Sequence, residues 1–291
     1  MQDTSIFADP AGSVAQSVLD RSLIVICWDG KGAPLEYVNR DCTAEFDLLV
    51  FDFSGSSAHT PEILSHKCAG KGEVIERTYV WLNSRLQPYR YVSVIDHDIE
   101  ISFSQINTLL AIGNANGLHS FAPALSRDSY YSFRHLLEHP GSEVRPVDFV
   151  EIMFPFYDAQ LFLYCARNFG GTVTAYGMDE FAIPASQKIL GLEKTAVIDS
   201  VVARHLRPVA SHKRSYANGL SAYQERGLTR RLAMVRIALE RSELVGTRWY
   251  FDTFARWNSL ARYWPMRLLA PAYFLRRLFR TMFDNPSVAT P

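Results

Sequence analysis

An acidic tripeptide, Asp96-His97-Asp98, directly follows the apolar stretch 89–95. The β-branched and aromatic residues of that stretch favour a buried strand. If the chain stays extended through the tripeptide, Asp96 and Asp98 point the same way and His97 points away. Mg²⁺ and Mn²⁺ prefer such all-oxygen sites and share them with substrate phosphates. A surface turn after a core strand is the alternative interpretation, because Asp-x-Asp is a short motif.

The elements that would position this tripeptide alternate between apolar runs and helical patterns. Near-continuous apolar strands separated by crossover-length segments indicate an α/β fold with a mostly parallel sheet flanked by helices. The apolar runs predict strands at 23–28, 46–53, 89–95, 117–124, 147–156 and 195–202. The helical patterns predict helices at 61–83, 103–114, about 130–138, 158–169, 179–190 and, in several pieces, from about 219 onwards.

Polar residues recur where the predicted strands end. Asp29, Asp52, the Asp96/Asp98 pair and His205 all lie at such ends or just beyond them. Ligands of open α/β sheets bind beyond the carboxyl ends of the strands. The recurrence therefore predicts one binding site built from several strands.

Composition sets the class of protein. The chain has 291 residues, of which 48% are hydrophobic and 21% charged, which is typical of a globular protein with a substantial core. It has no apolar run of transmembrane length and no secretory signal at its start, so we expect a cytoplasmic protein. Its four cysteines lack zinc-site spacing and fit reduced residues better than a disulfide framework.

Four segments occur in an order that resembles a known group of enzymes. They are Asp96-His97-Asp98 after a strand, 149–156 before a helix, Tyr176-Gly177-Met178-Asp179 opening a helix, and 197–206 ending in His205-Leu206. This order resembles GT-A-type glycosyltransferases and, more narrowly, a plant and bacterial family called domain of unknown function 707. The resemblance covers about residues 22–210. The chain departs from that family's pattern at His97, where an acid is usual, and before Gly177, where a tryptophan is usual.

The resemblance implies a GT-A-like, Rossmann-like fold with a metal-assisted donor site. Asp96, Asp98 and His205 would hold Mn²⁺ or Mg²⁺ against the donor diphosphate, and Lys213 and Arg214 would bind phosphate oxygens. The alternative for His205 is a helix-capping or surface histidine. The alternative for Lys213 and Arg214 is an ordinary solvated basic turn.

The resemblance also implies an acceptor side. Asp179 occupies the position that supplies the general base in many GT-A enzymes, with Glu180 as its backup. A first-turn acid favoured by the helix dipole is the alternative for Asp179. Asp148 and Glu151 would bind acceptor hydroxyls, or would simply be polar residues of an edge strand.

Further residues would bind the donor. Trp28, Asp29 and Asp52 would contact the nucleoside, and Lys67 and Lys71 are phosphate candidates. Core packing is the competing interpretation for Trp28.

The C-terminal region differs in charge from the rest of the chain. Residues 246–283 carry seven arginines and one acid, so a net charge of +6 there is balanced by −6 elsewhere. Residues 248–283 also contain eleven aromatic side chains. Arginines opposite aromatic and leucine side chains on short helices are typical of segments that bind an anionic membrane surface. Packing on the domain or on another subunit is the alternative, and we expect no nucleic-acid binding, because the rest of the chain is acidic.

The sequence thus predicts a catalytic domain at 1–217 and a helical region at 218–291. Its function would be metal-dependent transfer of a sugar from a nucleotide-sugar donor to a glycan or glycolipid acceptor, lipid-linked or polysaccharide, at the cytoplasmic membrane face. A non-catalytic binding protein on the same scaffold and a metal-dependent phosphoryl-transfer or hydrolytic enzyme remain alternatives. The donor, the acceptor, the stereochemistry and the oligomeric state stay open.

Overall fold

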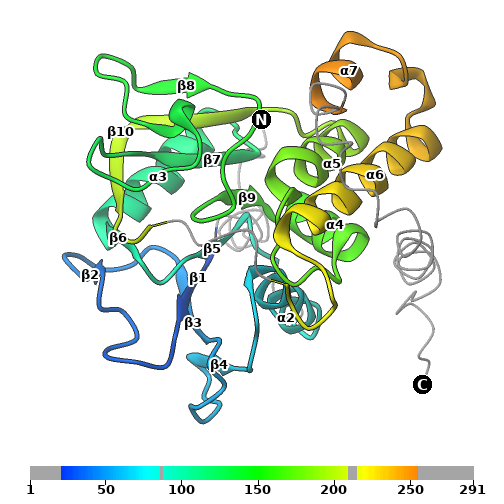
Figure 1. The fold of residues 1–291 in the computed structure, drawn as a ribbon. Coiled ribbons are helices and arrows are strands. Elements are labelled where there is room, and N and C mark those ends of the chain that lie inside the picture. The colour runs from blue at the N-terminus through cyan, green and yellow to red at the C-terminus, as the bar shows by residue number, and fades with distance from the viewer. Residues whose placement is uncertain (1–20, 86–87, 209–214, 255–291) are drawn as a thin grey trace, which may run out of the picture.

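The computed structural model describes residues 21–85, 88–208 and 215–254, and within them ten strands form one sheet (Figure 1). The strand order is β2-β6-β10-β7-β9-β5-β1-β3-β4, with β8 paired to β10 outside this path. The strands are β1 (Leu23–Trp28), β2 (Val38–Asn39), β3 (Asp47–Asp52), β4 (Ile63–Ser65), β5 (Tyr91–Ile95), β6 (Ile99–Ser102), β7 (Ser120–Leu125), β8 (Val144–Pro146), β9 (Phe156–Asp158) and β10 (Thr195–His205).

The strand directions place the predicted site residues at one edge of the sheet. β4, β3, β1 and β5 run parallel to one another. β9 is antiparallel to both β5 and β7, and β7 is parallel to β10. β5, β7 and β10 therefore run in the same direction, and the carboxyl ends of β1, β3, β5 and β10 lie along the same edge.

Helices cover the sheet on both sides (Figure 1). They are α2 (Lys71–Asn83), α3 (Phe103–Ala115), α4 (Ala159–Phe169), α5 (Ile183–Leu190), α6 (Ala222–Glu240) and α7 (Arg248–Phe254). α2, α4, α5 and α6 gather on one side, while α3 packs against β6, β7 and β10 on the other. This arrangement confirms the predicted α/β fold with a mostly parallel sheet.

Local sequence signals start the helices where the structure has them. Ser102 and Gln105 form a capping box that begins α3, and Ser221 and Gln224 form another that begins α6. The side chain of Asp158 accepts a hydrogen bond from the Gln160 amide at the start of α4. Each cap satisfies amide groups that the first helical turn leaves without partners.

Three predicted elements are wrong. The helix predicted at 61–83 is a short strand, β4, and then a helix that begins at Lys71. The strand predicted at 147–156 is a buried loop that becomes strand only at Phe156, so an apolar run here marks burial and not extended pairing. The helix predicted at 130–138 is reduced to the single 3₁₀ turn Arg134–Leu136.

The acidic tripeptide does not stay extended, and the chain follows the alternative interpretation of a turn after a core strand. β5 ends at Ile95, and the tripeptide forms a turn in which the Ile99 amide donates to the Asp96 carbonyl at 3.3 Å. The chain then continues into β6, which the sequence did not predict. The side chains of the turn therefore face three different partners: Lys71 for Asp96, Arg207 for His97 and His205 for Asp98.

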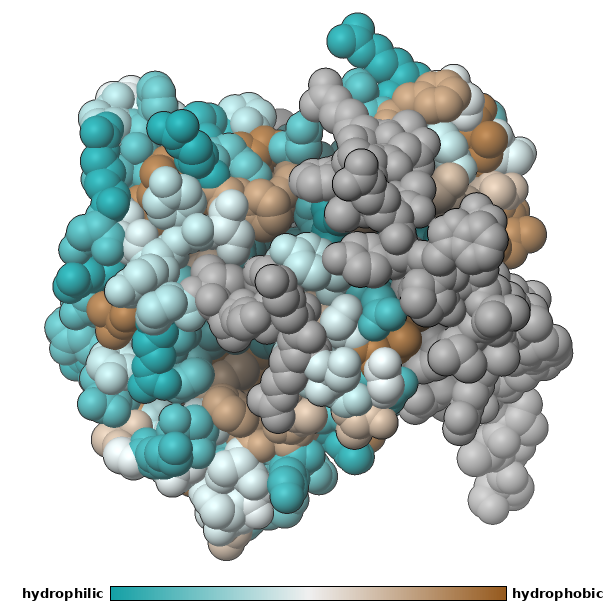
Figure 2. Space-filling model, viewed as in Figure 1, coloured by the Kyte–Doolittle hydropathy of each residue, from teal (hydrophilic) through white to brown (hydrophobic). Residues whose placement is uncertain are grey.

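The first part of the C-terminal region packs on the core. Phe254 is buried and contacts Phe181 with a ring-centroid distance of 6.1 Å, while Phe251 is 54% exposed. The rest of the predicted membrane segment, 255–283, lies outside the described residues. No helix in the described ranges is long and apolar enough to span a bilayer. On the face seen in Figure 2, hydrophobic residues of the described chain show as separate groups among hydrophilic ones.

Candidate active site

The carboxyl edge of the sheet encloses a cavity of about 350 Å³. Residues from six separate parts of the chain line it, including six with carboxylate, imidazole or ammonium side chains. Those six are Lys71, Asp96, His97, Asp98, Glu151 and His205. The structure thus brings together the acidic tripeptide, one of the two predicted acceptor residues, one predicted phosphate ligand and the histidine that ends β10.

Asp98 and His205 face each other inside this cavity. Asp98 Oδ2 lies 3.5 Å from His205 Nε2, and both residues are buried. The antiparallel pairing of β10 with β6 sets this distance, because it places His205 opposite Ile99. The other ring nitrogen, Nδ1, lies 2.8 Å from the Tyr130 carbonyl, which orients the ring by accepting a hydrogen bond from Nδ1–H.

The two groups shift each other's titration. Burial alone would raise the pKa of Asp98, but the facing His205 ring outweighs it and holds the pKa below its ordinary value. Burial alone would lower the pKa of His205, but Asp98 and the Tyr130 carbonyl outweigh it and raise the pKa above 6.5. Without another cation, the pair is most favourable as carboxylate and imidazolium.

Asp96 points to a different partner. Lys71 Nζ donates to Asp96 Oδ1 at 2.5 Å and to the Val94 carbonyl at 2.8 Å. The Lys71 side chain is 11% exposed and comes from the first turn of α2. The predicted phosphate ligand therefore neutralises one of the predicted metal ligands.

A divalent ion fits two of the three predicted metal ligands. With Nδ1–H donating to the Tyr130 carbonyl, His205 Nε2 and Asp98 Oδ2 are left to bind a cation between them. Among the described residues no three His, Cys, Asp or Glu side chains lie close enough together to hold a metal ion. A hard ion here would take two protein ligands and fill its remaining positions with phosphate oxygens and water, as Mg²⁺ commonly does.

Glu151 forms another part of the cavity wall. Its Oε1 accepts a hydrogen bond from Ser132 Oγ at 2.6 Å, and its Oε2 is buried without a hydrogen-bond partner in the described part of the chain. Burial raises the pKa of Glu151 to about 7, with the negative charges of Asp96 and Glu180 adding to the effect. Sequence reasoning missed Ser132, which lies in a polar stretch without a motif.

The two predicted catalytic acids lie behind this wall and are not among the residues that line the cavity. Gly177 has φ 86°, which favours glycine, and it begins a π-helical turn, Met178–Ala182, that carries both acids. Asp179 accepts hydrogen bonds from the Glu180 amide at 2.9 Å and the Ile152 amide at 3.3 Å. Burial, followed by the charges of Glu180 and Glu151, raises the pKa of Asp179 well above its ordinary value.

Glu180 is held by a partner that the sequence did not indicate. Arg226 of α6 donates to both of its carboxylate oxygens, at 2.5 and 2.6 Å. Each side chain is only 8% exposed. Glu180 is therefore committed to a buried ion pair that joins α6 to the π-helical turn.

The predicted nucleoside residues lie beside the cavity. Trp28 and Asp29 line a small adjoining cavity of about 20 Å³, which shares His97 with the larger one. His97 Nε2 accepts a hydrogen bond from Arg207 at 2.7 Å and lies 3.9 Å from Asp29 Oδ2. His97, to which the sequence assigned no role, therefore lines both cavities.

The other predicted site residues are placed elsewhere. Asp52 is fully buried, and both of its oxygens accept hydrogen bonds from serines of its own loop and from Ser65. Those donors hold the pKa of Asp52 far below its ordinary value even though burial opposes them. Lys67 and Asp148 are exposed and do not line either cavity. Lys213 and Arg214 lie outside the described residues.

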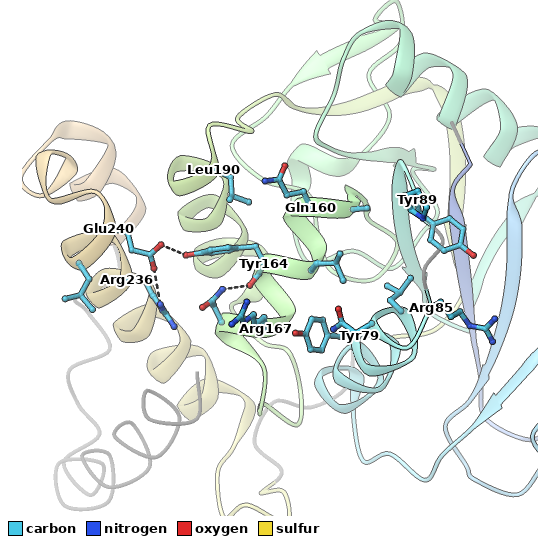
Figure 3. Close-up of a pocket in the computed structure, with 16 residues that line it drawn as sticks. Tyr79, Arg85, Tyr89, Gln160, Tyr164, Arg167, Leu190, Arg236 and Glu240 are labelled. Carbon is cyan, nitrogen blue, oxygen red and sulfur yellow. Dashed lines mark hydrogen bonds and ion pairs between the residues drawn. The ribbon is translucent and has the colours of Figure 1, made fainter. Parts of the chain in front are cut away.

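A larger groove of about 1010 Å³ lies between α2, α4 and α6 (Figure 3). None of the predicted site residues lines it. Its one acidic residue, Glu240, accepts hydrogen bonds from Tyr164 at 2.8 Å and Arg236 at 3.0 Å. We assign the chemistry to the smaller cavity, because that is where carboxylate, imidazole and ammonium groups meet.

Comparison with known proteins finds solved structures with a similar fold but no matching family. No protein-family model and no curated protein matches the chain. The structure of S. aureus TarS 1-349 in complex with UDP-GlcNAc is similar at a TM-score of 0.54 and 12% identity, over 88% of this chain and 81% of that one. A structure of S. aureus TarS is similar at a TM-score of 0.50 and 10% identity, over 89% of this chain and 49% of that one. The chain therefore shares the GT-A-like α/β fold of TarS, a staphylococcal glycosyltransferase.

Proposed function

We propose that the protein transfers a sugar from a nucleotide-sugar donor to an acceptor hydroxyl. One observation carries this proposal: Asp98, His205 and Glu151 line a single cavity at the carboxyl edge of the sheet. The fold supports it, because TarS has a similar fold and binds UDP-GlcNAc. No family model matches the chain, so the narrower resemblance to domain of unknown function 707 does not support the proposal.

Asp98 and His205 would hold a Mn²⁺ or Mg²⁺ ion, and the donor diphosphate would complete its coordination. The ion would supply positive charge against the negative charge that develops on the leaving diphosphate. Lys71 holds Asp96 and two backbone carbonyls, at Val94 and Met153, and so fixes the turn that carries Asp98. Trp28 and Asp29, which line the neighbouring cavity, would contact the nucleoside.

A thermal-shift screen tests the proposal. The probes are UDP-, GDP- and CMP-linked sugars and the free nucleotides, each with Mn²⁺ and with EDTA. A ligand at about 100 times its Kd stabilises the folded state by roughly 2.7 kcal/mol, which raises the Tm of a chain of this size by roughly 5–10 °C. We expect UDP-GlcNAc or another nucleotide sugar to give this shift with Mn²⁺ and not with EDTA.

Two variants sharpen the screen. Asp98→Asn should abolish the Mn²⁺-dependent shift, while Glu143→Gln, a matched change at an exposed carboxylate away from the cavity, should leave it intact. A screen in which no nucleotide sugar stabilises the protein would refute the proposal. Binding without turnover would instead favour a non-catalytic scaffold, and release of phosphate without any sugar chemistry would favour a phosphoryl-transfer enzyme.

We further propose that the acceptor is a lipid-linked or polysaccharide chain at a membrane surface. Support comes from the seven arginines and eleven aromatic residues in and around the segment 246–283. Because Phe254 packs in the core, a chain that ends after it keeps that contact. Such a chain should lose flotation with vesicles that contain anionic lipid, with an unchanged melting curve as its control. Equal flotation of the shortened and full chains would contradict this assignment.

A further inference from the structure

The carboxylates around the cavity differ in how far they are already engaged. Asp96 is paired with Lys71, and Asp98 faces His205. Two more acids, Asp179 and Glu180, belong to the π-helical turn behind the wall and are held by backbone amides and by Arg226 respectively. Each of these four groups already has a partner.

Glu151 is the exception. It lines the cavity, and only one of its two carboxylate oxygens is engaged, by Ser132. The other oxygen, Oε2, is shielded from water and has no hydrogen-bond partner among the described residues. A buried acceptor without a donor is costly, and native structures rarely leave one without a reason. Because Oε2 is shielded from water, a hydroxyl group bound in the cavity would supply the missing donor once the Glu151 side chain turns toward the cavity.

We propose that Glu151, and not Asp179, is the general base that takes the proton of the acceptor hydroxyl. This inference rests on the proposed function. In the step, the acceptor oxygen bonds to the anomeric carbon of the donor sugar while its proton passes to Glu151 Oε2. The bond between the anomeric carbon and the diphosphate oxygen breaks, and its electron pair leaves with the nucleoside diphosphate. The product is therefore inverted at the anomeric carbon.

The charges around Glu151 suit a base. Burial, together with Asp96 and Glu180, raises the pKa of Glu151 to about 7, although the Ser132 hydroxyl and His205 oppose the rise. A general base works best when its pKa lies near the working pH. Ser132 then acts as a positioning residue, because its hydroxyl fixes one oxygen and leaves the other for the substrate.

Asp179 receives a different role. Its Oδ2 accepts a hydrogen bond from the Ile152 amide, and Ile152 directly follows Glu151 in the chain. Asp179 therefore holds the loop that carries the base in place against the cavity. We assign it as a positioning residue.

The test compares Glu151→Gln with Asp179→Asn in the full chain. The probe is the nucleotide sugar that gives the largest thermal shift, and the assay is release of nucleoside diphosphate to water or to an added sugar acceptor. Glu151→Gln should lower kcat by about 10²–10⁴-fold, the usual contribution of a general base, with the nucleotide-sugar thermal shift unchanged. Asp179→Asn should lower kcat by less than about tenfold and should also lower the Tm. Glu143→Gln is the matched control and should match wild type.

Two further readouts separate a base from a structural residue. The wild-type rate should rise with pH through about 7, because the base must be deprotonated, and this limb should vanish in Glu151→Gln. Nuclear magnetic resonance of the product should show inverted configuration.

A product with retained configuration would overturn the inference. The inference would also be overturned if Glu151→Gln kept activity within about threefold of wild type while Asp179→Asn was folded but inactive. In both cases nucleotide-sugar binding would still stand, so failure of Glu151 is distinguishable from failure of the proposed function. If no nucleotide sugar binds, both fail.

Discussion

The buried ion pair between Arg226 and Glu180 offers a stringent test of the structure. Its two hydrogen bonds, at 2.5 and 2.6 Å, join α6 to the turn that carries Asp179, and both side chains are 8% exposed. Substituting Met for Arg226 keeps most of the side-chain volume but leaves the Glu180 carboxylate buried without its cation.

The expected loss of stability is large because desolvation of the orphaned carboxylate is no longer compensated. Breaking a buried ion pair by removing one partner costs about 3–5 kcal/mol, whereas replacing both partners is often nearly neutral. For a chain of this size each kcal/mol corresponds to roughly 2–4 °C in Tm. Arg226→Met should therefore lower the Tm by roughly 6–20 °C, and the double variant Arg226→Met/Glu180→Gln should recover at least about half of that loss.

Urea unfolding followed by circular dichroism gives the free energies for this cycle, with wild type, both single variants and the double variant measured together. Two results would contradict this prediction: a cost of less than about 1 kcal/mol for Arg226→Met, or a double variant that is less stable than Arg226→Met. Either result would mean that the pair is not buried as the structure has it.

Three other outcomes follow from described contacts. Without metal, Asp98 has a pKa below its ordinary value and His205 one above, so the pair should stabilise the fold most between about pH 4 and pH 6.5. This contribution is lost as pH falls through the lowered pKa of Asp98 or rises through the raised pKa of His205, and urea unfolding in EDTA should show His205→Gln flattening the profile. Gly113→Ala should destabilise by about 1–3 kcal/mol, because its Cβ would lie 2.4 Å from Phe121 Cζ, whose ring is fully buried; an unchanged Tm would contradict this. Of the four cysteines only Cys42 is exposed, so a native-state thiol assay should find one fast thiol, and two or more would contradict the packing.

The sheet could be predicted from the sequence where burial and pairing coincide. β1, β3, β5 and β10 are apolar runs that end at or just before polar residues, so their existence and their common edge followed from the pattern, whereas their order in the sheet did not. The short strands β2, β6 and β8 have two to four residues each and carry no such pattern. They are fixed by their neighbours in the sheet, and single-sequence reasoning has no access to those neighbours.

The sequence predicted several of the residues that line the candidate site, but not how those residues are paired. Asp98, His205 and Glu151 do share a cavity. Neither the pairing of Lys71 with Asp96 nor that of Arg226 with Glu180 could be predicted, because the two partners of each pair lie far apart in the chain. Which carboxylate stays unpaired depends on these distant partners, and that is why the expected base and the base that we propose differ.

The pairing of β10 with β6 has a consequence for how the protein folds. His205 meets Asp98 only through this antiparallel contact, which joins segments that lie far apart in sequence. Contacts of such long range form after local ones, because closing the intervening loop costs entropy that is recovered late. The cavity should therefore be absent from partly folded chains and should appear only with the complete sheet. Nucleotide-sugar binding would then report the final stage of folding as well as activity.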